Sequence, residues 1–129
     1  MNVGLRPWLL LLAASLLMAA KPNLGAFRSP QICQAAIASL QGVKANQVKL
    51  YRNLKEGWQF SLDHLGKTDS YLCQLQADTV LWRRSQDSRW QHSPSIRYQF
   101  NSSARQLFIR HYLGEAQLAE FSFRSNDFY

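Results

Sequence analysis

The hydrophobic positions of this chain have a helical period in one early segment and a strand period in most of the residues after it. In residues 29–42, four apolar side chains recur at the spacing of one helix face: Cys33, Ala36, Ile37 and Leu40. Ser29 suits the cap, Pro30 the first helical position and Gly42 the end of the helix. The pattern predicts a short helix over this segment.

After the helix, apolar and polar residues alternate with period 2 in short segments that are separated by turns, which is typical of half-buried strands. The predicted strands are 48–53, 58–65, 70–76, 79–84, 96–100, 105–113 and 118–124. Successive strands joined by short turns form an antiparallel meander. The predicted fold class is therefore α+β, with one N-terminal helix that packs on, and covers one face of, a meander of six or seven strands.

The first 20 residues have the pattern of a secretory signal peptide. Arg6 gives a positive start, residues 8–18 are apolar, and Ala19 and Ala20 are small residues suited to cleavage. The apolar run is shorter than the roughly 20 residues that a membrane span needs, so no span is expected in the mature chain. We predict an exported protein, periplasmic or secreted. Its parts are a signal peptide at 1–20, an exposed lead-in at 21–28, a single domain at 29–124 and a tail at 125–129.

The chain has two cysteines, Cys33 in the predicted helix and Cys73 in a predicted strand. Two cysteines in an exported chain most simply form one disulfide, whereas a metal site or a reactive thiol would need partners that the sequence does not place nearby. Closing a loop of this length stabilises a fold by roughly 4 kcal/mol in the chain-entropy model. We therefore predict a structural disulfide that pins the helix to the sheet.

The sequence offers little for catalysis. The three histidines, His64, His92 and His111, lie in separate segments, and zinc needs three or four converging ligands. We find no nucleophile elbow, no phosphate-binding glycine loop and no spare cysteine. We therefore expect no enzyme activity, no metal and no cofactor. His64 and His111 fall on the apolar side of their strands, which predicts partly buried histidines near the sheet edge.

A first candidate binding site lies in residues 81–92, LWRRSQDSRWQH, within and before a predicted irregular segment at 85–95. Arginine beside tryptophan can stack on rings, bind carboxylates or phosphates, and anchor a protein interface. The candidate partner-binding residues are Arg83, Arg84, Arg89 and Trp90. The alternative is that Trp82 belongs to the core and the arginines form a solvated strand end.

A second candidate is the sheet face that points away from the helix, where Phe108, Arg110 and Tyr112 are expected together with Arg97 and Arg124. Basic and aromatic residues on an open sheet can stack nucleic-acid bases. Exported proteins seldom meet nucleic acid, so that partner is disfavoured. Cross-strand packing of the rings and dimerisation through this face are the alternatives.

Four short motifs follow one another along the chain: the helix CQAAIASLQG, the strand motif Y-L-C, the strand motif V-L-W and the dipeptide R-W. They resemble the C-x-A-A-I-A helix, Y-x-C strand, I/V-x-W strand and G-R-W turn of an uncharacterised family of small secreted bacterial proteins. The likeness covers roughly residues 31–123. The chain departs from it in having Ser88 before Arg89, and Lys-Glu-Gly in place of an Asp-Gly turn. The resemblance implies an exported fold of one helix and an antiparallel sheet, and no activity.

The formal net charge is +7, with 15 Lys and Arg against 8 Asp and Glu, and the charges are spread without a long run of one sign. Such a balance favours anionic partners. We predict a non-catalytic exported binding module that recognises a protein or an envelope component, and an inhibitor or immunity-type role is one concrete version. The alternative is an envelope-associated polyanion-binding protein that uses the basic and aromatic patches.

Overall fold

The computed structural model of the protein describes residues 27–129. The predicted signal peptide and the first part of the lead-in lie outside the described residues. No helix in the described part is both long and apolar enough to cross a membrane. The elements are the helix α2 (Ser29–Gln41), the 3-10 turn η1 (Ala45–Gln47), the strands β1 (Val48–Leu54), β2 (Gly57–His64), β3 (Lys67–Gln76), β4 (Thr79–Arg84), β5 (Gln91–Phe100), β6 (Gln106–Leu113) and β7 (Ala116–Arg124), and the 3-10 turn η2 (Ser125–Phe128).

The seven strands form one sheet in the order β1-β2-β3-β4-β5-β6-β7, and every neighbouring pair is antiparallel. The predicted meander and fold class are confirmed. Strand β5 begins at Gln91, within the segment that the sequence predicts to be irregular, because Gln91 pairs with Trp82 of β4. The irregular connection between β4 and β5 is therefore shorter than predicted.

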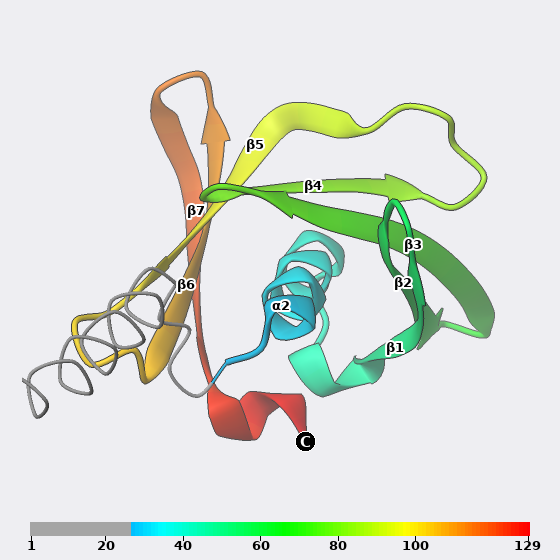
Figure 1. The fold of residues 1–129 in the computed structure, drawn as a ribbon, viewed down its shortest axis with the longest axis horizontal. Helices are drawn as coiled ribbons and strands as arrows, with labels where there is room; N and C mark the ends of the chain where they lie inside the picture. Colours follow the sequence, from blue (N-terminus) through cyan, green and yellow to red (C-terminus); the bar gives the residue numbers. More distant parts are fainter. Residues whose placement is uncertain (1–26) are drawn as a thin grey trace, which may run out of the picture.

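The sheet curves around α2, which lies inside the curve and covers the concave face (Figure 1). The burial of the helix extends beyond the predicted stripe, with these residues removed from solvent: Gln31, Ile32, Cys33, Ala35, Ala36, Ile37, Ala38 and Ser39. A helix that is apolar around its circumference is a buried helix. The helix therefore covers one face of the sheet, as predicted, and the curvature of that face encloses it further than a flat sheet would.

The disulfide joins Cys33 of α2 to Cys73 of β3, with the two Cα atoms 5.9 Å apart, as predicted. A second link ties the helix to the chain after it. The side-chain amide of Gln34 donates hydrogen bonds to the carbonyls of Ala45 and Val48, at 2.8 and 2.9 Å. These contacts hold η1 and the start of β1 against the helix.

Both ends of the described chain belong to the core, which corrects two predicted boundaries. The predicted tail forms η2, and Phe128 within it is buried. Phe27, in the last part of the predicted exposed lead-in, is also buried. Its ring lies 5.6 Å from that of Phe100 and 5.9 Å from that of Phe128, measured between ring centres. The three rings extend the domain beyond residues 29–124.

Candidate functional site

Because α2 fills the concave face, the side chains free for chemistry gather on the convex, outer face of the sheet. Alternation along β6 buries Leu107, Ile109 and His111 inside and turns the residues between them outward. The second candidate set, Phe108, Arg110 and Tyr112, is therefore brought together on one face. On the neighbouring strands, the register adds outward-facing Arg97 and Gln99 of β5 and Glu120 of β7. We call these six residues the basic-aromatic face.

The centre of this face is a row of three charged residues across three strands. Arg97 of β5 is the direct cross-strand partner of Arg110 of β6, and Arg110 is the partner of Glu120 of β7. Like charges directly opposite each other destabilise a sheet, and opposite charges stabilise it. The charge of Arg110 is therefore balanced by Glu120, whereas Arg97 has no acidic cross-strand partner in this row.

Arg110 is the compensated arginine. Its Nε donates to a carboxylate oxygen of Glu120 at 2.8 Å, and its Nη1 donates to the side-chain carbonyl of Gln99. The guanidinium lies 5.4 Å from the centre of the Phe108 ring. The hydrogen bond to Glu120 raises the pKa of Arg110 above its ordinary value. Arg110 is thus held as a fixed positive charge over an aromatic surface.

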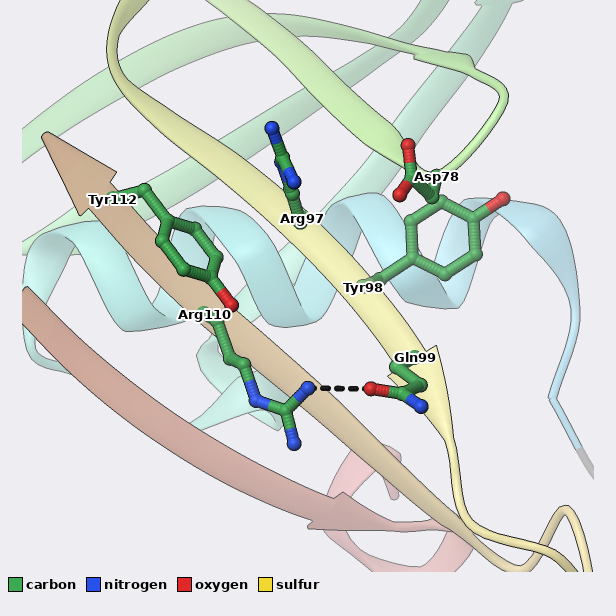
Figure 2. Close-up of a pocket in the computed structure, with 6 residues that line it drawn as sticks. All are labelled: Asp78, Arg97, Tyr98, Gln99, Arg110 and Tyr112. Atoms are coloured by element: carbon green, nitrogen blue, oxygen red, sulfur yellow. Dashed lines mark hydrogen bonds between the residues drawn. The ribbon is translucent and has the colours of Figure 1, made fainter. Parts of the chain in front are cut away.

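Arg97 is exposed, and neither salt bridge found within residues 27–129 involves it. Its guanidinium lies 5.2 Å from the centre of the Tyr112 ring. Figure 2 shows that the side chains of Arg97 and Arg110 extend in opposite directions from β5 and β6. That divergence is what repulsion between like charges favours, and it leaves the Arg97 donors open to solvent.

These side chains border a hollow of about 390 Å³, here called the first hollow. Asp78 and Tyr98 form the side nearest the β3–β4 turn (Figure 2). The Tyr98 hydroxyl donates to the carbonyl of Ala77 at 2.6 Å. Burial, and then the charge of Asp78, raise the pKa of Tyr98. The tyrosine therefore stays neutral and fixes one side of the hollow.

The first candidate set is not brought together as one open site. The Arg83 side chain is only 13% exposed and donates to a carboxylate oxygen of Glu56 at 3.1 Å. It also donates to the carbonyls of Ser85 and Asp87, and its guanidinium lies 5.1 Å from the centre of the Trp90 ring. Arg83 thus connects the β1–β2 turn to the segment after β4.

The other two arginines of that set stand apart from this arrangement. Arg84 is exposed and, by alternation along β4, points to the opposite side of the strand from Arg83. Arg89 is exposed in the connection between β4 and β5. Leu72 and Leu81 are buried on the outer phase of β3 and β4, outside the main core. The region around Arg83 is therefore well suited to holding the loop in place.

The three histidines do not converge. His111 is buried, and its Nε2 lies 2.9 Å from the Ser39 hydroxyl, which itself donates to the carbonyl of Ala36 at 2.7 Å. His64 is exposed at the end of β2, so its predicted partial burial is wrong, and the prediction for His111 understates its burial. Within residues 27–129, no group of three or more His, Cys, Asp or Glu side chains is arranged to hold a metal.

Buried His111 makes the stability of the fold depend on pH. Desolvation lowers the pKa of His111 below its ordinary 6.5, so the unfolded chain binds a proton more readily than the folded one. The urea midpoint should therefore fall as the pH drops from 7 through 6.5 and level off below the folded pKa of the histidine. His111→Gln should flatten this slope between pH 7 and 5. His64→Gln, at an exposed position, should keep it, and equal slopes in all three proteins would contradict the assignment.

Comparisons with protein-family models, curated proteins and solved structures find no match to this chain. The resemblance to a small secreted family therefore stays a prediction. Among the residues of the basic-aromatic face, Gln99 and Glu120 are not singled out from the sequence, and neither is Asp78 beside it. Alternation alone would have placed Gln99 and Glu120 outward, but their positions opposite a phenylalanine and an arginine depend on the strand register.

Proposed function

We propose that this protein is a non-catalytic binding module that acts outside the cytoplasm and uses its basic-aromatic face to recognise an acidic protein surface. The disulfide supports a location in an oxidising compartment, because such bonds are rare in the cytosol. Aromatic residues and arginine are the residue types enriched where protein interfaces concentrate their binding energy. An inhibitor or immunity-type partner interaction fits this description.

The observation that carries the proposal is the uncompensated Arg97 opposite Arg110. Facing arginines cost the sheet stability, and a carboxylate supplied by a partner would remove that cost. The planar guanidinium of Arg97 is oriented over Tyr112 with its donors open, which suits a bidentate contact with a carboxylate. Charge complementarity therefore favours an acidic partner at this face.

A catalytic role for the buried Ser39 and His111 has less support. The Ser39 hydroxyl donates to Ala36, so it accepts from His111 and the histidine does not take its proton. Both side chains are buried within the core, away from the first hollow. A binding role on the outer face needs neither residue.

The test is capture of a partner from an envelope extract on purified, oxidised protein, at low salt and at about 0.15 M salt, with two charge-matched double variants. Arg97→Ala/Arg110→Ala removes two positive charges from the basic-aromatic face, and Arg84→Ala/Arg89→Ala removes two from the first candidate set. We expect a protein to be retained in stoichiometric amount by the unchanged chain and by the Arg84/Arg89 variant. The Arg97/Arg110 variant should lose it.

Other outcomes would overturn the proposal. Loss with the Arg84/Arg89 variant alone would move the site to the β4–β5 connection. Equal loss with both variants, together with capture of mixed anionic material only at low salt, would favour the polyanion-binding alternative. Polyanion binding weakens steeply as salt rises because it depends on counterion release, whereas a packed protein interface loses much less.

A further inference from the structure

A second hollow of about 530 Å³ lies at the other end of the same strands, and no acidic side chain lines it. Its lining is Asn101, Ser103, Arg105, Gln106, Arg124 and Ser125. Arg105 and Arg124 are exposed, and neither takes part in the salt bridges found within residues 27–129. The second hollow is therefore a positively charged depression rimmed by hydroxyl and amide groups.

The two hollows lie along one face at a defined spacing. Gln106 and Arg110 both point outward from β6, and Arg124 is the cross-strand partner of Gln106. Four residues of a strand span about 13 Å. Midway between Gln106 and Arg110 stands Phe108, which is only partly buried and whose cross-strand partners are Gln99 and Ser122. The face therefore presents, in order, the first hollow with Arg97 and Arg110 opposite Asp78, an aromatic ring, and the second hollow with two arginines and no acidic side chain.

We infer that the partner contributes an extended segment with acidic, apolar and acidic side chains at alternate positions, an inference that rests on the proposed function. In an extended chain, residues i, i+2 and i+4 point to the same side and span the same distance of about 13 Å. One carboxylate reaches Arg97 in the first hollow, the other reaches Arg105 and Arg124 in the second, and the apolar side chain packs on Phe108.

A single-stranded nucleic acid fits this surface less well. Such ligands stack successive bases on several rings while their backbone runs along a continuous basic groove. Here one ring, Phe108, stands between the hollows, and the carboxylate of Glu120 lies beside the first hollow, bonded to Arg110. A continuous phosphate backbone would be repelled there and by Asp78 in the lining of the first hollow, whereas the peptide brings a single carboxylate to that hollow.

The test is fluorescence anisotropy with two labelled peptides of equal composition and the purified, oxidised protein at about 0.15 M salt. The spaced peptide is Gly-Glu-Ser-Phe-Ser-Glu-Gly and the control peptide is Gly-Glu-Glu-Phe-Ser-Ser-Gly. We expect the spaced peptide to bind about tenfold more tightly, a difference of about 1.4 kcal/mol. Arg124→Ala should abolish this preference, because the two peptides differ only in the position of the second carboxylate. Phe108→Ala should instead weaken the binding of both peptides, since both carry the phenylalanine at the same position. Lys67→Ala, which removes one exposed charge at the start of β3, should keep the preference.

Other results of the peptide experiment bear differently on the spacing of the acidic residues and on the proposed function. Equal binding of both peptides, lost with Arg97→Ala/Arg110→Ala, would overturn the spacing while leaving an acidic-protein site at this face. No binding of either peptide would overturn the inference, and the capture experiment would still decide the function. Tighter binding of an oligothymidylate of equal charge would overturn both in favour of nucleic acid.

The Arg124→Ala variant should keep the fold of η2. The hydrogen bond to Asp127 comes from the backbone N–H of Arg124, and the Arg124 side chain takes no part in it.

Discussion

Replacing Cys33 and Cys73 together by alanine should lower the free energy of unfolding by about 4 kcal/mol, since the bond closes a long loop. The sequence separation is 40 residues, and both cysteines are fully buried between helix and sheet. Domains of this size have a total stability of roughly 5–15 kcal/mol, so the loss is a large share of it. The measurement is urea unfolding of the unchanged and doubly substituted proteins.

A reductant provides the matched control for this prediction. Adding dithiothreitol to the unchanged protein should move its urea midpoint toward that of the double variant, and the variant itself should not respond. A difference below about 1 kcal/mol would show that the contacts of Gln34 with Ala45 and Val48 suffice to hold the helix in the sheet. The disulfide would then have little structural effect.

The strands and the helix are predictable from the sequence because their signals are local. Alternation along β6 and the apolar spacing in α2 depend only on residues within each element. The curvature of the sheet around the helix, by contrast, has no local signal in the sequence. It accumulates over seven strands, and it buries Ala35 and Ala38 on sides of the helix that the predicted stripe leaves exposed.

The candidate site was predictable in composition and not in arrangement. Alternation gives the shared face of Phe108, Arg110 and Tyr112, but the pairing of Arg97 with Arg110 depends on the register between β5 and β6. That register is set by the turn around residues 101–105, where the side-chain carbonyl of Asn101 accepts two backbone hydrogen bonds. A shift of one residue would turn every side chain of a strand to the other face.

The burial of the two ends of the domain is not predictable from the sequence, for a related reason. Phe27 and Phe128 lie outside the periodic segments, so no pattern marks them as buried. Phe128 becomes buried where η2 lies against η1, and there the side-chain amide of Asn46 donates to the carbonyl of Tyr129 at 3.1 Å. Phe27 becomes buried because its ring packs on those of Phe100 and Phe128. Contacts between distant ends of a chain leave no local signal in the sequence.

Gly57→Ala should destabilise the protein by on the order of 4 kcal/mol, from backbone strain of roughly 1–3 kcal/mol and overpacking of similar size. Gly57 begins β2 with φ +146°, which residues with a side chain rarely adopt. A Cβ there would lie 2.3 Å from the carbonyl oxygen of Cys73, a backbone atom fixed by the β2–β3 pairing and the disulfide. Neither atom can move without disturbing the strand that anchors the helix.

Gly66→Ala separates these two causes, since Gly66 has φ +78° but nothing within 4 Å of its Cβ position. It should show only the strain, roughly 1–3 kcal/mol, in the same urea titration. An equal loss in the two variants would mean that the contact with Cys73 adds nothing. A larger loss at Gly57, or failure of that variant alone to fold under oxidising conditions, would show that the close approach of β2 to the disulfide-bearing strand requires glycine.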